Sequence, residues 1–417
     1  MRRFQQKGSA VSRISDAGRR GVATEELRRH NLSAVLERLH LGGPLTRSDL
    51  ASQTGLNRST IRDLITELRS LGLVVESPGT PSTGPGRPSS VARVSGRGAV
   101  VVAVELEVDS IAVATIGLGG RIFTETREAI PKRNPQPEEL VAQLADLAAP
   151  LIAELPEDAS PVGVGVGVAG VVRRSDGFIH VAPNLGWRDV PIARLIQDTL
   201  GFDLVKVANE ADMGALGEYR RGAAVNSRDM IFVAGEVGVG IGIIHDSAPM
   251  LGLSGYAGEA GHMLINPRGV ECRCGAVGCW ETEVGEEALA RRAGIDLGDG
   301  AAPISEIVRR ADDGHVGTRT ALWELGRWLG IGIGNLVNIL NPDLVVVGGF
   351  YQQLYPYIAG AIELGAKEVA LEAPWAACSI ALSELGQSSV LIGAAELVHG
   401  DLIADPLLLV EELATTP

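Results

Sequence analysis

The chain has 417 residues, of which 45% are hydrophobic and 4% aromatic, so it is long enough for two or three domains and a sizeable core. No apolar run reaches the roughly 18 residues that a membrane helix needs, no signal-peptide pattern follows the basic N-terminus, and four cysteines are too few for a disulfide scaffold. These features exclude membrane-spanning, secreted and fibrous proteins and predict a cytoplasmic protein.

The net charge of −14 is distributed unevenly along the chain. Residues 1–97 carry 16 Lys and Arg against 8 Asp and Glu, a net charge of +8. The remaining 320 residues carry 21 basic and 43 acidic residues, a net charge of −22. A basic N-terminal part attached to an acidic body suits a polyanion-binding module joined to a soluble sensor or enzyme. We expect residues 1–24 to form a flexible basic arm.

Residues 25–97 have the helical periodicity of a helix-turn-helix domain. Apolar residues predict a first helix over residues 25–40 and a short second helix over residues 46–54. Asn57 is a natural N-cap for a third helix over residues 58–71. A short helix, a glycine-containing turn and a helix that begins Asn-Arg-Ser-Thr make up the helix-turn-helix pattern.

Two strand-like segments, residues 73–76 and 91–94, flank a Pro/Gly/Ser stretch and predict the wing of a winged helix. Recognition helices meet base edges and phosphates near their N-terminal end, and a basic wing tip enters a minor groove. The residues expected to contact DNA are Arg47, Ser48, Arg58, Ser59, Thr60, Arg62 and, in the wing, Arg87. The alternative is an ordinary three-helix bundle with solvated arginines, but the coincidence of pattern, charge and wing favours DNA binding.

Residues 98–417 alternate strand-like and helical segments, which is typical of a layered α/β architecture. The clearest strands are residues 100–104, 111–116 and 162–168, and an Ala/Leu-rich helix is predicted over residues 137–155. No G-x-G-x-x-G run opens a helix after a strand, so the glycine-rich turns are not dinucleotide-binding fingerprints.

A possible metal site is formed by three cysteines and a histidine within 18 residues: His262, Cys272, Cys274 and Cys279. Three thiolates and one imidazole satisfy tetrahedral Zn²⁺ with no open position, so we predict one structural zinc ion per chain. The alternative is a set of free surface cysteines, which four such ligands at this spacing disfavour. Cys378 lies far from the cluster and is expected in the core.

Carboxylates and amides suited to a polyol lie in and around the cysteine-rich segment. Sugar hydroxyls bind bidentate acceptors and amides that are held rigidly, and a zinc-stapled loop supplies rigidity. The candidates are Asn184, Asn209, Glu210, Glu259 and Glu281. Taken singly, each of them is more often a surface charge or a helix cap.

The run Gly-Tyr-Ala-Gly-Glu-Ala-Gly-His at residues 255–262 and the run Cys-x-Cys-Gly-x-x-Gly-Cys-x-Glu at residues 272–281 resemble the signature of the ROK family (repressors, open reading frames and sugar kinases). Residues 182–185, 209–211 and 341–349 also look like family segments, so the resemblance covers essentially the whole chain. It implies a two-lobed, actin/hexokinase-like domain with sugar between the lobes, zinc beneath the sugar-binding loop, and dimers or tetramers. By that similarity the sugar-contacting residues are Asn184, Asn209, Glu210, Glu259, His262 and Glu281.

Three departures from the ROK kinase pattern concern catalysis and the phosphate site. The kinases' Asp-x-Gly-Gly-Thr-like loop corresponds to residues 105–109, where Glu107 and Asp109 add negative charge. The second phosphate loop has Val237 where the phosphate-binding hydroxyl belongs. Glu210 replaces the catalytic Asp and moves its carboxylate by one methylene. Together these departures predict a domain that has kept its sugar site, lost its ATP site and has no catalytic residues.

The sequence therefore predicts a sugar-responsive transcriptional repressor. It is expected to bind operator DNA as a symmetric homodimer or homotetramer and to bind a monosaccharide or related sugar as effector. The alternative is an ATP-dependent sugar kinase with an appended DNA-binding domain. A third interpretation, a sugar sensor that acts mainly through a protein partner, is disfavoured by the basic wing.

Overall fold

The computed structural model describes residues 16–78, 90–130, 134–159, 161–296 and 303–407, with side chains from residue 25 onward. The chain forms two compact units, Met1–Val94 with Asp401–Pro417, and Ser95–Gly400. The sequence predicts a boundary after residue 97 and places the C-terminal end with the body. An ion pair of 2.5 Å between Arg29 Nη1 and Asp405 Oδ2 ties this end to the first unit instead.

The described residues of the N-terminal part of the first unit form three helices and a small antiparallel sheet, as in a winged helix. The elements are α1 (Asp16–Gly42), β1 (Leu45–Thr46), α2 (Arg47–Thr54), α3 (Arg58–Ser70), β2 (Val74–Pro78) and β3 (Ser90–Val94), with strand order β1-β3-β2. Most of the apolar stripe predicted for the first helix is buried, including Leu32 and Leu36, but Leu27 is 60% exposed. Leu27 therefore lies outside the core. Helix α1 begins at Asp16, so the flexible arm expected over residues 1–24 is wrong for residues 16–24, which are helical.

The turn between α2 and α3 is fixed by helix caps. Thr46 and Asp49 form a capping box at the start of α2. Gly55 ends α2 with a left-handed φ of 72°, a conformation that costs a side-chain-bearing residue energy. The side chain of Asn57 accepts a hydrogen bond from the backbone N–H of Thr60, which confirms the predicted N-cap.

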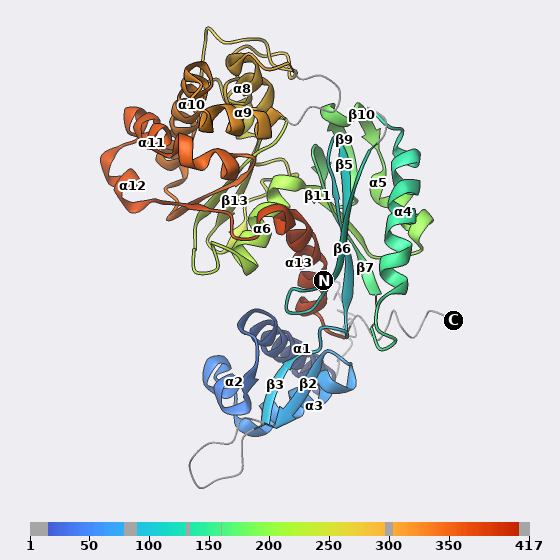
Figure 1. The fold of residues 1–417 in the computed structure, drawn as a ribbon. Helices are drawn as coiled ribbons and strands as arrows, with labels where there is room; N and C mark the ends of the chain where they lie inside the picture. The colour runs from blue at the N-terminus through green and yellow to red at the C-terminus, as the bar shows by residue number, and fades with distance from the viewer. Residues whose placement is uncertain (1–15, 79–89, 131–133, 160, 297–302, 408–417) are drawn as a thin grey trace, which may run out of the picture. The chain divides into compact units, whose positions relative to one another are not determined.

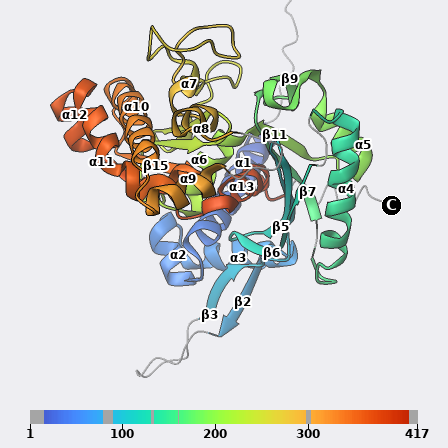
Figure 2. The ribbon, with the colours of Figure 1, turned by 45° about the horizontal axis from the view of Figure 1, so that its top comes forward.

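The second unit, residues 95–400, is built on two five-stranded mixed sheets (Figure 1). The first sheet has the order β11-β7-β4-β5-β6, with bounds β4 (Val100–Leu106), β5 (Ser110–Gly117), β6 (Arg121–Ala129), β7 (Pro161–Val168) and β11 (Val205–Asn209). Helices α4 (Pro137–Ala153) and α5 (Ile192–Leu200) cover one face of it (Figure 2). A small antiparallel sheet lies beside it: β8 (Val171–Arg173), β9 (Phe178–Ala182) and β10 (Trp187–Val190).

The second sheet has the order β14-β13-β12-β15-β16, with bounds β12 (Met230–Gly235), β13 (Val239–His245), β14 (Ala248–Pro249), β15 (Leu344–Gly349) and β16 (Ser379–Leu382). The helices of this lobe are α7 (Glu281–Val284), α8 (Glu286–Ala293), α9 (Pro303–Asp312), α10 (Val316–Leu340), α11 (Tyr351–Val369) and α12 (Glu372–Ala377). Its core joins one face of the sheet to α8, α9, α10 and α11. The predicted two-lobed α/β fold is thus confirmed.

Helix α6 (Glu210–Arg221) lies between the two sheets (Figure 1). Its Met213 packs in the core of the first sheet, and its Ala215 packs with Phe232 of the second. Helix α13 (Ser389–Ala404) packs against α6 and the first sheet. The N-terminus of α6 therefore lies where β11 ends, beside the turn between β12 and β13.

The predicted strands at residues 100–104, 111–116 and 162–168 and the helix at residues 137–155 correspond to β4, β5, β7 and α4. None of the helices in the described ranges combines the length and the apolar composition that a membrane crossing requires.

The close contact of α6 with α13 gives a stability prediction. A Cβ at Gly393 would lie 1.7 Å from the carbonyl oxygen of Met213, whereas a Cβ at Gly400 on the same helix would meet nothing within 4 Å. Gly393→Ala is expected to destabilise the protein by about 3 kcal/mol or more, because two backbones must separate. Gly400→Ala is the control and should be neutral or stabilising by up to about 1 kcal/mol. Denaturant unfolding checks both, and equal stabilities would contradict this packing.

Candidate ligand-binding and metal sites

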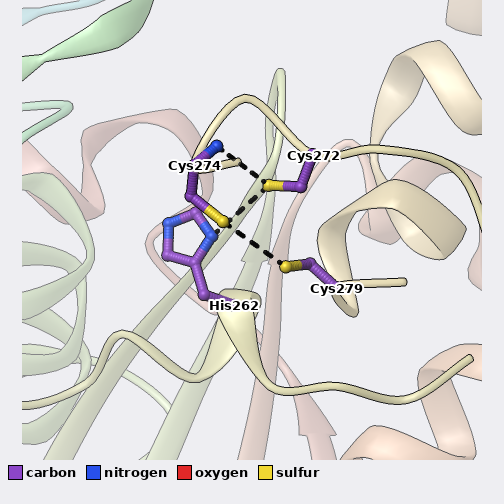
Figure 3. A group of neighbouring side chains, drawn as sticks. All are labelled: His262, Cys272, Cys274 and Cys279. Atoms are coloured by element: carbon purple, nitrogen blue, oxygen red, sulfur yellow. Dashed lines mark hydrogen bonds between the residues drawn. The ribbon is translucent and has the colours of Figure 1, made fainter. Parts of the chain in front are cut away.

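His262, Cys272, Cys274 and Cys279 meet as the sequence predicted (Figure 3). Their four donor atoms lie within 4.8 Å of one another. Cys274 Sγ is 3.6 Å from Cys279 Sγ, and Cys272 Sγ is 3.7 Å from His262 Nδ1. Around a tetrahedral zinc ion with Zn–S bonds of about 2.3 Å, neighbouring donors are separated by about 3.7 Å. The donor set and its spacing therefore fit zinc.

The segment that carries the cysteines is anchored to the core of its lobe. Trp280 is completely buried, and its Nε1–H donates to the carbonyl oxygen of Trp328 at 3.0 Å. A Cβ at Gly278 would lie 1.8 Å from the carbonyl oxygen of Asn266, so the two backbones touch there. The loop is thus held by packing at Trp280 and Gly278, and the cysteine cluster joins the exposed Cys274 to the buried Cys272 and Cys279.

His262 connects the cysteine cluster with two of the predicted sugar-site carboxylates. Its Nδ1 faces Cys272 and lies 3.5 Å from Glu281 Oε1, while its Nε2 lies 3.9 Å from Glu259 Oε2. The side chains of His262 and Glu259 are 40% and 45% exposed, so both are accessible to a ligand. The Nδ1 atom of His262 can therefore bind a metal while its Nε2 atom lies beside a hydrogen-bond acceptor, the carboxylate of Glu259.

The start of α6 carries the next two predicted residues. Asn209 caps the helix, since its Oδ1 accepts from the backbone N–H of Ala211 at 2.8 Å, and its Nδ2 donates to the carbonyl oxygen of Gly170 at 3.1 Å. Glu210 is buried, and within the described part of the chain its Oε2 has no hydrogen-bond partner. A buried carboxylate oxygen without a donor is costly, and a ligand hydroxyl would satisfy it.

Asp212, in the first turn of α6, belongs to this site and was not predicted. It is only 7% exposed. Burial raises the pKa of Asp212 to about 7, the Arg174 guanidinium opposes the shift, and the carboxylate of Glu259 adds to it. Asp212 and Glu259 therefore influence each other electrostatically. The signal for Asp212 was its place two residues after Glu210 in an Asn-Glu-Ala-Asp run.

Asn184 reaches the same region through a contact that the sequence did not indicate. It lies in a 3₁₀ turn, Pro183–Leu185, beside the small sheet. Arg273, between two cysteines of the cluster, donates to Asn184 Oδ1 with one nitrogen and to Glu287 with another. This guanidinium joins the two lobes of the second unit at the predicted sugar site.

On the other side of the α6 N-terminus, carboxylates gather around one arginine. Arg127 on β6 donates to Glu105 and Glu107. Burial, reinforced by Glu107, raises the pKa of Glu105 to about 8 although Arg127 opposes the shift. Burial also raises the pKa of Glu236 to about 7, and burial together with Glu236 raises that of Glu210 well above its usual range. A single guanidinium thus faces several carboxylates.

The predicted DNA-contacting residues differ in how their side chains are used. Arg58, Ser59 and Arg62 are exposed in the first turns of α3, and Ser48 is exposed on α2. Thr60 is half-buried.

Several of these side chains have partners within the unit. Arg62 pairs with Asp63, and Ser59 Oγ donates to Asn57 at 2.6 Å. Arg47 donates with two nitrogens, at 2.8 and 2.9 Å, to Glu76 on β2, so its guanidinium fixes α2 to the sheet. Arg87 lies outside the described residues.

Comparisons with known proteins agree with this architecture. A family model described as "ROK family" matches residues 101–401. A xylose repressor of Caldicellulosiruptor bescii is 30% identical over 397 residues, which cover 91% of this chain and 98% of that protein. Among solved structures, a ROK family transcriptional regulator described as a homolog of the E. coli MLC protein has a TM-score of 0.77 at 23% identity, covering 93% of this chain and 99% of the other. A ROK family glucokinase from Streptomyces griseus, solved with glucose and AMPPNP, has a TM-score of 0.63 at 29% identity, covering 72% and 99%.

The carboxylates around Arg127 predict how stability varies with pH. Between about pH 4.5 and 8 the folded chain keeps a proton on Glu105 that the unfolded chain releases, so the free energy of unfolding falls as pH rises through this window. In Glu105→Gln the free energy of unfolding should decline less with pH. The stability of the variant relative to the parent should therefore rise by on the order of 2 kcal/mol between about pH 5.5 and about pH 8.5. Denaturant unfolding at both pH values measures this, with Glu128→Gln, exposed on the same sheet, as control. Parallel declines for parent and Glu105→Gln would contradict it.

Proposed function

The chain belongs to the ROK family, and on that premise we propose that it is a sugar-responsive transcriptional repressor. One observation carries the proposal. The similarity to a repressor extends over 98% of that protein and includes the N-terminal unit, whereas the glucokinase covers only 72% of this chain. DNA as partner and a zinc-thiolate cluster both suit the reducing cytoplasm, where we place the protein.

The operator is bound by the first turns of α3. Arg58 and Arg62 contribute positive charge at the end of the helix that carries Ser59, where recognition helices approach bases and phosphates. Arg47 positions α2 through Glu76 and is not a base contact. A homodimer or homotetramer presents two such helices to a two-fold-symmetric operator.

The sugar is bound around the N-terminus of α6. Glu259 and Glu281 accept pairs of sugar hydroxyls, and His262 Nε2 lies beside Glu259 to complete the acceptor–donor arrangement. Glu210 offers a buried oxygen that needs a donor. Asn209 positions this helix end, and Asn184 is held by Arg273 at the opposite lobe.

Zinc is the structural metal of this site in our proposal, held by His262, Cys272, Cys274 and Cys279. With four protein ligands it leaves no open position for chemistry, so its part is to fix the ring of His262 and the loop that leads to Glu281. The spacing of the donors supports zinc, because it matches the edges of a tetrahedron.

The nucleotide site of the kinases is lost in this proposal. Glu105, Glu107 and Glu236 lie where the kinase pattern has its two phosphate loops, and Arg127 is already engaged by two of these carboxylates. A triphosphate would have to enter a partly buried cluster of carboxyl groups whose shared cation, Arg127, already donates to two of them. The kinase alternative has the similarity to glucokinases in its favour, and the assay below separates the two.

Zinc removal gives a direct prediction. Cys274→Ala is expected to lose the metal and to weaken sugar binding, because the loop that bears His262 and Glu281 loosens. Cys378→Ala, which removes a cysteine outside the cluster, should keep one zinc per chain. Elemental analysis of the purified variants and of the parent measures the zinc content. A parent protein without zinc would contradict the proposed metal site.

Nucleotide binding and phosphoryl transfer should both be absent. A thermal-shift screen of hexoses, pentoses and amino sugars, with and without Mg-ATP, should show stabilisation by a sugar and none by the nucleotide. Phosphate transfer to the same sugars should stay far below about 1 per second, the lower end of ordinary turnover. Turnover at or above that rate would establish the kinase.

A substitution in the sugar site should weaken sugar binding without changing the affinity for operator DNA. Glu259→Gln keeps the size of the side chain but removes its charge, so sugar binding should weaken by about 1–3 kcal/mol. Operator affinity without sugar should equal that of the parent. Glu271→Gln, an exposed carboxylate in the cysteine-rich loop, is the matched control. If Glu259→Gln abolished operator binding without sugar, Glu259 would be a structural residue and the sugar site would lie elsewhere.

A further inference from the structure

A pocket lies in the first lobe of the second unit, among elements that the proposed sugar site does not use. Its volume is 380 Å³, within the range of pockets that hold small metabolites. The turn between β8 and β9, helix α5 and strand β11 form its walls. Neither the glutamates of the sugar site nor the cysteine cluster lines it.

The walls of this pocket are positively charged on an otherwise acidic body. Arg174, Arg194 and Lys206 line it, and Asp176 is the carboxylate among the lining residues. Asp176 is engaged by Arg173 through bonds of 2.6 and 2.8 Å, so its charge is compensated. Arg194 pairs with Asp198 on the same helix at 3.0 Å, and its side chain stays 72% exposed. Cationic side chains from three elements suit a doubly charged anion such as a phosphoryl group.

The remaining lining suits a hydroxylated ligand body. Phe178 contributes an aromatic ring, over which the Arg173 guanidinium lies at 4.7 Å, and Ser175 and Gln197 supply polar groups. A pocket lined by basic residues, polar side chains and an aromatic ring has a composition that suits a phosphorylated polyol.

Two lines of contact lead from this pocket to the loop that carries Glu259 and His262. Phe178 packs edge-on against His180 with centroids 5.2 Å apart, and His180 packs edge-on against Tyr256 at 5.6 Å. Tyr256 belongs to that loop. Arg174 provides the second line, because it lines the pocket and lies beside Gly255, where an added Cβ would be 3.4 Å from its Cγ.

We propose that this pocket is a second ligand site for a small phosphorylated metabolite of about the size of a sugar phosphate, and that its occupancy alters the loop at residues 255–262. The bound anion draws the Arg174 guanidinium, whose charge also acts on Asp212 at the sugar site. Phosphate and sugar thereby bind with a mutual coupling that is equal in both directions. We expect each to weaken the other about fivefold.

Calorimetric titration of the full chain with glucose 6-phosphate, inorganic phosphate and glucose tests the site. Glucose 6-phosphate should bind the parent and lose at least about tenfold in affinity in Arg194→Ala/Lys206→Ala. Ser175→Asp, which adds a negative charge at an exposed position of the pocket and keeps the cations, should show the same loss. Arg228→Ala, an exposed arginine paired with Asp246 in the other lobe, is the control and should bind normally.

Glu259→Gln separates this proposal from the proposed function, because phosphate binding in the pocket does not need the sugar site. Retained binding of glucose 6-phosphate in Glu259→Gln supports the pocket. Loss in Glu259→Gln without loss in the pocket variants would place the phosphorylated sugar in the sugar site and overturn the proposal, as would no binding at all. If inorganic phosphate binds as tightly as glucose 6-phosphate, the phosphoryl site stands but the sugar-phosphate assignment is overturned.

Hydrogen exchange tests the coupling on the same samples. Saturation with glucose 6-phosphate should change exchange at residues 255–262 by about threefold or more in the parent, and His180→Ala should reduce the change. Unchanged exchange in the loop of a phosphate-saturated parent would overturn the coupling.

Discussion

The structure depends on the burial of a carboxylate-bearing helix end between two sheets. α6 begins where β11 ends, and its first turn carries Glu210 and Asp212 in surroundings that exclude water from both. A carboxylate at a helix N-terminus is stabilised by the helix dipole, but burial opposes ionisation more strongly here, as the raised pKa values of both residues show. A ligand that donates hydroxyl protons relieves this cost, which is why a sugar suits the place.

The two sides of this helix end differ in what they offer. Toward the cysteine cluster, His262 and Glu259 are accessible and Glu281 is partly exposed, and His262 lies within 4.8 Å of the three cysteine donors. Toward the first sheet, carboxylates crowd around Arg127. In our proposal a neutral polyol binds the first side. A nucleotide would have to enter the second side, where Arg127 already donates to Glu105 and Glu107.

Much of this arrangement could be predicted from local sequence. The cap at Asn57 involves only that side chain and the helix it begins, and the four candidate metal donors lie within 18 residues. Arg127 could not be found in this way. It faces Glu105 because Glu105 pairs with Ala112 across β4 and β5, and Ala112 pairs with Arg127 across β5 and β6. That register is set by the whole sheet.

The contact of Arg273 with Asn184 joins residues from two lobes, and no periodic pattern in the sequence predicts such a contact. In the helix-turn-helix, too, the sequence pattern does not predict how the elements contact one another. The pattern identified α2 and α3, but the use of Arg47 as a brace for Glu76, and the exposure of Leu27, depend on how the elements pack. Local sequence patterns therefore predict which segments are helices or strands and which residues could bind a metal. Which polar side chains lie near the proposed ligand depends on contacts between distant segments.

The central claim is that a sugar alone, without nucleotide, controls operator binding by this chain. The most direct measurement is equilibrium binding of the full-length protein to an operator fragment selected from random duplex DNA, with each sugar of a panel and with or without Mg-ATP. We predict that at least one sugar changes operator affinity about tenfold or more and that Mg-ATP has no effect. If no sugar changed operator affinity, or if the change required Mg-ATP, the claim would be contradicted.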